Sequence, residues 1–347
     1  MRRYVLQTIA VAAGFLVALF CAVLYLPSPI AAEYGTREIF VIKREIALAT
    51  ASPKIVFLGG SSTLFGIDAR EVEAESGLRA VNLGLHAAMH LDRLLSLSKE
   101  VERPGDILAL MFEHGFYHCK TKNWTDWQIR NSLAWDRPYF DGLPFLTRIR
   151  AVVSAGPLPL AIEVLSSGLM SHVFPEDYVA RIDAMAPPEV IMTQFESGRY
   201  RPTSFAYSPY NLDDHGDMPQ NQGTSYLGPG VPATAPGEIC PELIPILKDF
   251  VDHMRAIDVR VLVAHTPYLV ESAPASGWEE SERHFTQDIA ATGAEMLDTR
   301  EELFLPRKYF FDTQFHLNEL GRHERTKLLI NDLKRLGIGR PVASSLR

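Results

Sequence analysis

The chain has little cysteine, no excess of basic residues and no internal repeat. Its 347 residues include 34 lysines and arginines against 42 aspartates and glutamates, which gives a formal net charge of −8. Phosphate binding requires a basic face, so this balance argues against a nucleic-acid partner. Hydrophobic residues make up 47% of the sequence, enough to fill the core of one large domain or of two small ones.

Only three cysteines occur, so the chain can close at most one internal disulfide. Cys21 lies in an apolar N-terminal run, whereas Cys119 and Cys240 fall in the remaining, soluble part. In an oxidising compartment these two could pair across the middle of the chain. They are equally compatible with free buried thiols, and the sequence leaves both alternatives open.

Charged side chains are absent from the N-terminal run Val5 to Leu26. The run has about the length of a helix that crosses the hydrocarbon core of a bilayer. Arg2 and Arg3 before it favour a cytoplasmic N-terminus, which places the rest of the chain in the periplasm or outside the cell. A cleaved signal peptide is the alternative, but its apolar core is normally shorter and no good cleavage site follows. We expect an uncleaved transmembrane anchor at 5–27 and a stalk at 28–53.

Beyond this stalk, strand and helix patterns alternate. Strand patterns occupy 54–58, 79–83, 107–112, 259–264 and 295–298, and helical patterns occupy 68–76, 90–102, 241–257, 278–292 and 317–336. Such alternation predicts the α/β class, with a central parallel sheet and helices on both faces in a three-layer α/β/α sandwich. We assign this domain to 54–340. In such sheets the active site lies at the carboxyl ends of the strands. Five candidate positions fall just after predicted strands: Ser61, Gly84, Glu113, His265 and Asp312.

The alternation breaks between 118 and 240. Helical patterns occur at 161–170 and 175–186, and the stretch 200–236 is dense in Pro, Gly, Asn, Asp and Tyr. A long irregular segment in a compact domain is usually functional or disordered, and this one holds too many aromatic residues for simple disorder. We interpret 118–240 as an insertion, or lid, that covers the active site and selects the substrate.

Two segments at opposite ends of the soluble part carry the candidate chemistry. In the first, a buried-strand pattern runs into the turn Gly59-Gly60-Ser61, and in the second, Asp312 and His316 precede a helical pattern. A serine on a sharp strand-to-helix turn, with a base and an acid delivered from elsewhere, is the minimum requirement for acyl transfer through a covalent ester. Each motif alone is weak, because Gly-Gly-Ser is a common turn and Asp312 could simply cap the last helix. Together they predict a catalytic triad.

These motifs resemble the SGNH (GDSL-type) hydrolase superfamily, whose fold is a flavodoxin-like sandwich. The turn Gly59-Gly60-Ser61 matches the first block of the family, with Gly60 in place of Asp. The segment Val81-Asn82-Leu83-Gly84 resembles its second block, which carries a glycine after the second strand. Asp312 and His316 match its last block, with three residues between them in place of the usual two. The resemblance covers about half of the chain, in two flanking pieces.

The third block of the family departs from the pattern. It usually provides an Asn that donates a hydrogen bond to the oxyanion, whereas the corresponding stretch 111–115 contains Glu113 and no Asn. A carboxylate cannot donate when it is ionised. The usual three-donor oxyanion hole is therefore incomplete in this sequence.

The resemblance implies a role for each matched residue. Ser61 would attack an ester carbonyl, His316 would take its proton and later return it, and Asp312 would fix the tautomer of the histidine. The backbone N–H groups of Ser61 and Gly84 would hold the oxyanion. Four more residues are candidates for the substrate pocket: Asn82, Glu113, Tyr117 and His265. For Glu113, Tyr117 and His265 a structural role is the alternative.

The sequence implies no cofactor and no metal. His86 and His90 have the i, i+4 spacing of a zinc pair, but the Glu of the metalloprotease motif is missing. His114, His118 and Cys119 form a weaker candidate set of ligands.

A membrane-anchored, outward-facing domain of this kind resembles bacterial proteins that add or remove O-acetyl groups on envelope or secreted polysaccharides. Several of those proteins work beside a polytopic membrane acyltransferase. The sequence therefore predicts a serine esterase or O-acyltransferase acting on a carbohydrate ester. A catalytically weak accessory protein that binds within a polysaccharide modification or export system is the alternative. A lipase would need an apolar acyl groove, and the insertion contains no strongly apolar stretch to form one.

Overall fold

The computed structural model describes residues 1–119, 124–198, 207–221, 223, 226–230, 239–272 and 277–339. The chain divides into two compact units. Unit 1 comprises Met1–Glu38 and Lys122–Pro187, and unit 2 comprises Ile39–Thr121 and Pro188–Arg347. The predicted insertion at 118–240 is thus divided, because its first part groups with the N-terminal helix and its second part with the α/β unit.

Unit 2 is built on a five-stranded parallel sheet in the order β2-β1-β3-β4-β6. Its strands are β1 (Lys54–Gly59), β2 (Arg79–Gly84), β3 (Ile107–Met111), β4 (Arg260–Val263) and β6 (Glu295–Met296). The predicted α/β class and parallel sheet are confirmed. In the register, Gly59 lies opposite both Gly84 and Met111, so the first three strands end at one level.

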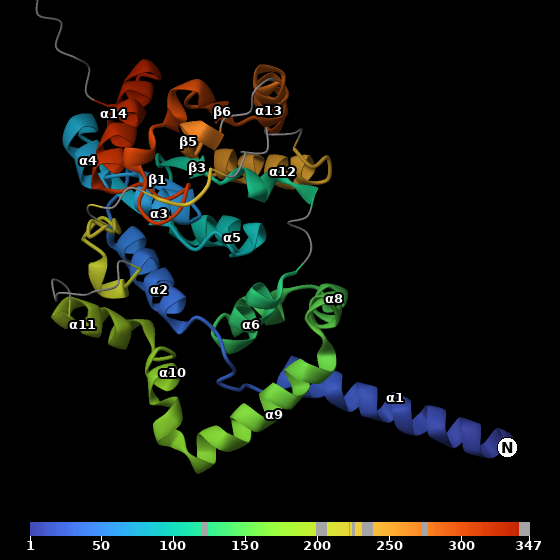
Figure 1. Cartoon of the computed structure of the whole chain (residues 1–347). Helices are drawn as coiled ribbons and strands as arrows, with labels where there is room; N and C mark the ends of the chain where they lie inside the picture. The colour runs from blue at the N-terminus through green and yellow to red at the C-terminus, as the bar shows by residue number, and fades with distance from the viewer. Residues whose placement is uncertain are drawn as a thin grey trace, which may run out of the picture. The chain divides into compact units, whose positions relative to one another are not determined.

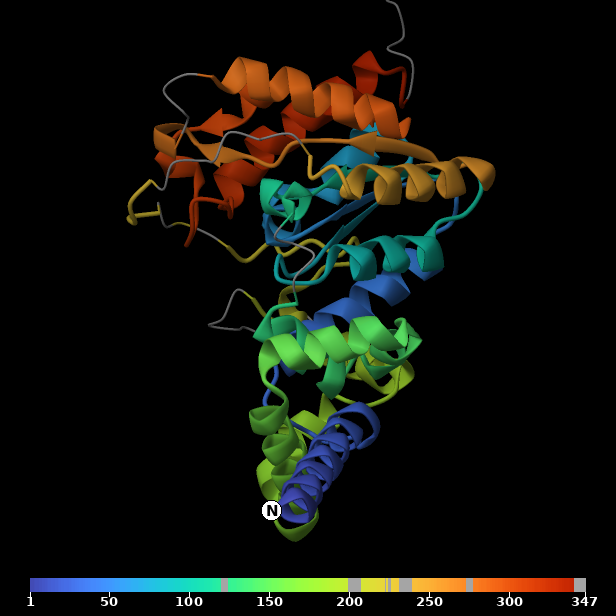
Figure 2. The same cartoon turned by 90° about the vertical axis from the view of Figure 1, so that its right-hand side faces the viewer.

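Helices lie on both faces of this sheet (Figure 2). The helices of unit 2 are α2 (Tyr34–Ala49, which begins in unit 1), α3 (Ser61–Gly66), α4 (Ala69–Ser76), α5 (Leu91–Val101), α11 (Pro188–Gly198), α12 (Leu243–Ala256), α13 (Trp278–Thr292) and α14 (Glu319–Arg335). Helices α4 and α14 share one core cluster with the strands, whereas α5 covers the other face (Figure 2). Helix α4 begins after Asp68, which accepts from the Glu71 amide, and ends at Gly77 with a φ of 75°.

The predicted stalk at 28–53 is mostly helix α2, which corrects the sequence interpretation. Ile39, Ile42 and Ile46 recur at helical spacing and are buried. A stripe of this kind drives a helix to pack on a core rather than to remain an extended linker. Residues 39–49 of the expected stalk therefore belong to the α/β unit.

A second, two-stranded sheet was not predicted. It pairs β5 (Tyr268–Leu269) with β7 (Phe304–Leu305) in parallel. These short strands contribute Leu269 and Leu305 to a buried apolar cluster, which Phe310 and Leu317 complete. The cluster holds in place the segment that leads into α14.

Unit 1 is helical. Its helices are α1 (Arg2–Tyr25), α6 (Asp126–Ala134), α7 (Arg137–Gly142), α8 (Phe145–Ala155), α9 (Pro157–Val173) and α10 (Val179–Asp183). Helix α1 is long and apolar enough to cross a membrane, in agreement with the predicted span at 5–27. Helix α9 packs against α1 (Figure 1), and α8 meets α9 at a bend of 92°.

Candidate active site

Asp312 does not directly follow a strand, which corrects the sequence-based expectation; it lies with His316 in a tight loop before α14. Phe310 and Leu317 form an antiparallel bridge, and the Phe311 amide donates to the His316 carbonyl oxygen at 2.8 Å. Across this closed loop, Nδ1 of His316 lies 2.8 Å from Oδ1 of Asp312. The spacing of three intervening residues is therefore compatible with an acid–histidine pair.

The interaction with His316 favours the ionised form of Asp312. Partial burial opposes ionisation of Asp312, but the hydrogen bond and the charge of His316 outweigh it and lower the pKa of this carboxyl. When Nδ1–H donates to Asp312, Nε2 becomes the basic nitrogen of the neutral ring. The alternative role of Asp312 as a helix cap is wrong, because Asn318 caps α14 through the Gly321 amide at 3.0 Å.

Ser61 opens α3 directly after the end of β1. It is 9% exposed, and Gly60 precedes it as the N-cap residue of the helix. The ring of Phe65, one turn along α3, lies 4.8 Å from the ring of His316. The structure thus places all three predicted triad residues in one neighbourhood at the carboxyl end of β1. Within the described residues Ser61 Oγ makes no hydrogen bond, and catalytic contacts often tighten only when substrate binds.

Glu113 follows β3 and lies beneath the first turn of α3. Its Oε1 accepts from the Ser62 amide at 2.8 Å. A Cβ on Gly60 would lie 2.3 Å from Glu113 Oε2, so the carboxyl group occupies the space that the glycine leaves open. Burial raises the pKa of Glu113. The backbone amides of Ser62 and Glu113, the Ser62 side chain and the charge of His316 only partly oppose that rise. Glu113 is therefore a close neighbour of Ser61.

The predicted oxyanion role of Gly84 is wrong in this structure. The Gly84 amide donates to Oδ1 of Asn82 at 2.8 Å and so already has an acceptor. A Cβ at Gly84 would lie 2.3 Å from the Leu64 amide nitrogen, so this glycine permits close packing of β2 against α3. The Ser61 amide, in contrast, has no acceptor among the described residues.

Asn82 is not a pocket residue. It is fully buried, and its amide nitrogen donates to Oδ1 of Asp217 at 2.9 Å and to two backbone carbonyls of α3. Nζ of Lys43 donates to its side-chain oxygen at 3.1 Å. Burial lowers the pKa of Lys43 and raises that of Asp217. Neither partner was predicted from the sequence, although a lysine inside the apolar stripe of α2 is a signal of a buried charge.

Tyr117 and His265 are buried rather than arranged around an open pocket. His265 is 2% exposed, and its Nε2 lies 2.6 Å from Oε1 of Glu282, which supports the structural alternative. Tyr117 packs edge-on against Phe285, and burial followed by the charge of Glu113 raises its pKa. Its hydroxyl is buried without a hydrogen-bond partner among the described residues.

Cys119 and Cys240 form a disulfide. Within the described ranges, these two residues and Glu242 are the one cluster with metal-ligand spacing. A disulfide sulfur is not a thiolate ligand, so the oxidised pair leaves this cluster without the donors that a metal needs. The alternative of free thiols, left open by the sequence, does not hold in this structure.

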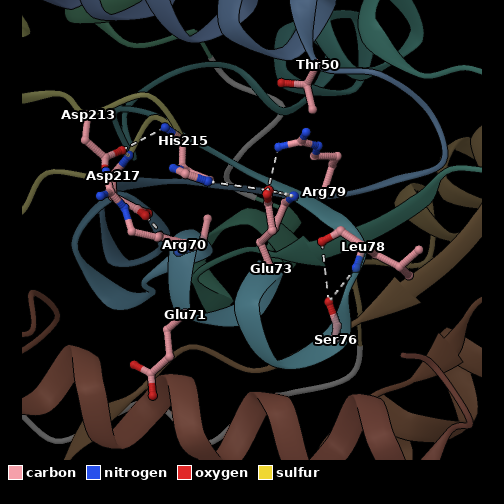
Figure 3. Close-up of polar contacts among 12 residues, drawn as sticks. Thr50, Arg70, Glu71, Glu73, Ser76, Leu78, Arg79, Asp213, His215 and Asp217 are labelled. Carbon is pink, nitrogen blue, oxygen red and sulfur yellow. Dashed lines mark hydrogen bonds and ion pairs between the residues drawn. The ribbon is translucent and has the colours of Figure 1, made fainter. Parts of the chain in front are cut away.

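A cavity lies elsewhere in unit 2. It has a volume of about 550 Å³ and borders the amino end of β2, where Arg79 stands. Nearby, Glu73 pairs with Arg79 at 2.9 Å and with His215 at 3.4 Å (Figure 3). His215 in turn donates its amide to Asp213 at 2.8 Å, so the network ties the segment 213–217 to β2. No serine or cysteine lines the cavity among the described residues, so the candidate site remains the one at the carboxyl end of β1.

No known family model matches the chain, and searches among curated proteins and solved structures found no similar protein.

Proposed function

We propose that the protein is a membrane-anchored, SGNH-like serine esterase or O-acyltransferase that acts on an ester of a carbohydrate. The observation that carries the proposal is the Asp312–His316 hydrogen bond, set beside the helix that begins with Ser61. The sheet order supports it as well, because its five strands follow the doubly wound order 2-1-3-4-5 of flavodoxin-like folds when counted along the chain.

The residues suffice for a two-step acyl transfer. Oγ of Ser61 forms a bond to the acyl carbon, and Nε2 of His316 takes the hydroxyl proton. The ester C–O bond then breaks, and the same proton passes to the leaving alcohol oxygen. In the second step, Nε2 of His316 takes a proton from the incoming hydroxyl, whose oxygen bonds to the acyl carbon. The bond between the acyl carbon and Ser61 Oγ breaks, and the same proton returns to Ser61 Oγ. Asp312 keeps the imidazole in the required tautomer throughout.

Water as the incoming hydroxyl gives hydrolysis, and a sugar hydroxyl gives transfer. Aromatic side chains that unit 2 contributes to the predicted insertion, such as Tyr207, would stack on sugar rings. A transferase would receive its acyl group from a polytopic membrane acyltransferase. Helix α1 would hold the enzyme in the bilayer, with its N-terminus cytoplasmic and the α/β unit in the periplasm.

A second candidate is an accessory protein that binds carbohydrate without turning it over. The occupied Gly84 amide favours this candidate, because it removes one expected oxyanion donor. Loss of one such donor typically lowers the rate by about 10²- to 10³-fold.

The test uses the full chain in detergent with an activated acetyl ester. Ser61→Ala should abolish turnover, whereas Ser62→Ala should leave it within a few-fold, since Ser62 Oγ has no partner within the described residues. Intact mass should show an acetyl adduct in the wild type and none in Ser61→Ala. An adduct without turnover indicates a transferase. Equal rates and no adduct in any variant would exclude the enzyme and favour the binding protein.

A further inference from the structure

The position of Glu113 suggests a replacement for the missing oxyanion donors. The carboxyl group contacts the chain on both sides of Ser61: Oε1 accepts from the Ser62 amide, and Oε2 lies against Gly60. Oε2 is buried and has no hydrogen-bond partner within the described residues, although the Ser62 side chain is near enough to lower the pKa of Glu113. A buried polar atom without a partner costs free energy unless a ligand satisfies it.

We propose that Glu113 acts as a neutral carboxylic acid and donates a hydrogen bond from Oε2 to the oxyanion that forms on Ser61. This role rests on the proposed function. In the neutral acid Oε1 remains an acceptor for the Ser62 amide, so the proton belongs on Oε2. The Ser61 amide supplies the second donor. Glu113 thereby replaces the Asn of the third block, which this sequence lacks.

The groups around Glu113 are consistent with a neutral acid. Burial is the largest influence on its pKa and raises it. His316, from the loop before α14, favours the ionised acid only when the imidazole is charged. Tyr117, one turn along the segment after β3, is itself kept neutral by burial. A neutral acid in an apolar site can serve as an oxyanion donor.

The test compares pH profiles of kcat/KM for Glu113→Gln and Glu113→Ala. The wild type should lose activity at alkaline pH as Glu113 ionises. Gln keeps a permanent N–H donor, so Glu113→Gln should stay within about tenfold of the wild type and lack that alkaline limb. Glu113→Ala should fall by about 10²-fold or more. Glu102→Gln is the matched control, because burial also raises the pKa of Glu102, at the end of α5.

If Ser61→Ala is inactive, either of two results would overturn the proposal. In the first, kcat/KM of Glu113→Gln falls as far as that of Glu113→Ala. In the second, the alkaline loss of activity persists in Glu113→Gln. Turnover that survives Ser61→Ala would instead remove the proposed function and this role together. Infrared spectra give a readout independent of turnover. The carbonyl band of a protonated carboxyl should be present at neutral pH and weaken in Glu113→Gln, and an unchanged spectrum would also overturn the proposal.

A separate observation concerns the outer face of α9 in unit 1. This helix is rich in apolar residues, contrary to the expectation that 118–240 contains no strongly apolar stretch. Five of its apolar side chains are 46–65% exposed: Leu158, Ile162, Leu165, Leu169 and Val173. They recur every three or four residues and form one stripe. The opposite face is buried and carries Leu160, Ala161 and Val164. An exposed apolar stripe opposite a buried apolar face indicates that a second apolar environment covers the helix.

The neighbour of α9 indicates what covers this stripe. Helix α9 packs on α1, and the buried residues of α1 are confined to its last two turns: Leu19, Ala22, Val23 and Leu24. The acidic residue within α9, Glu163, is paired with Arg130. An apolar stripe thus lies beside the end of a helix that is able to span a bilayer, and it carries no unpaired acid.

We infer that the stripe of α9 lies in the lipid interface at the point where α1 leaves the bilayer. The test uses the full chain in nanodiscs, with Cys21→Ser and a single environment-sensitive label at Leu165→Cys or Leu169→Cys. Both labels should be quenched by lipids brominated on their acyl chains. A label at Lys248→Cys on α12, a charged and exposed position, is the control and should not be quenched. Labels on α9 that match this control would overturn the inference.

Discussion

At the scale of single residues, the hydrogen bond between Asp312 and His316 does the most to define the site. The side chain of Asp312 is 54% exposed, so its substitution should leave the fold intact. Asp312→Asn allows the wrong imidazole tautomer and should lower kcat by about 10²- to 10⁴-fold with little change in KM. Asp252→Asn, at an exposed ion pair on α12, is the control. A loss of less than threefold in Asp312→Asn would remove Asp312 from the mechanism.

The structure leaves no room for a Cβ atom at Gly60. In Gly60→Ala the new Cβ meets the buried carboxyl of Glu113 at 2.3 Å, so that carboxyl must move. We expect a drop in turnover of at least tenfold and a lower melting temperature, since overpacking typically costs about 1–3 kcal/mol. Gly66→Ala is the matched control, because nothing lies within 4 Å of the added Cβ. Equal behaviour of the two variants would contradict the assigned position of Glu113.

At the scale of elements, the disulfide ties the segment after β3 to the start of α12. The bridge closes a loop of 121 residues, and the Cys240 amide donates to the Tyr117 carbonyl oxygen beside it. Removal of a cross-link over so long a loop should lower the free energy of unfolding by about 4 kcal/mol. Urea unfolding of Cys119→Ser checks this, with Cys21→Ser as the control. A change below about 1 kcal/mol would show that the bridge is dispensable.

Helix α14 carries a buried acid whose ionisation opposes folding. Burial, followed by the charge of Asp298, raises the pKa of Asp332 to about 6. As the pH rises from 4, Asp332 ionises first in the unfolded chain, because in the folded chain its pKa is raised. The folded state therefore loses stability relative to the unfolded state until Asp332 also ionises in it, near pH 6. The stability of Asp332→Asn relative to the wild type should therefore increase between pH 4 and pH 7. Thermal melts at several pH values check this, and a constant difference would contradict it.

Elements with a clear pattern were predictable from the sequence, and those without one were not. The strand 54–58 is apolar throughout, and the helix 68–76 has an N-cap Asp and a terminal glycine, so β1 and α4 appear almost as predicted. The two-residue strands β5 and β7 are too short to show any periodicity. Helix α2 was not predicted, because its apolar stripe falls within the segment interpreted as a stalk.

At the scale of the whole molecule, the sequence identified the triad candidates but not the acceptors of the backbone amides. Ser61 was recognisable because it follows the strand pattern at 54–58. Asp312 and His316 were recognisable because they precede the last helical pattern. The assignment of Gly84 failed because the acceptor of its amide, the side chain of Asn82, is fixed only by the folded geometry. The division into two units was equally hidden, since 122–187 group with an N-terminal helix that is remote in sequence.

The most direct test of the account is covalent labelling of the full chain with a fluorophosphonate, followed by peptide mapping. We expect one labelled residue, Ser61, with labelling slowed at least a hundredfold in His316→Ala and unaffected in Ser62→Ala. Labelling of another serine, or a rate at Ser61 that does not depend on His316, would contradict it.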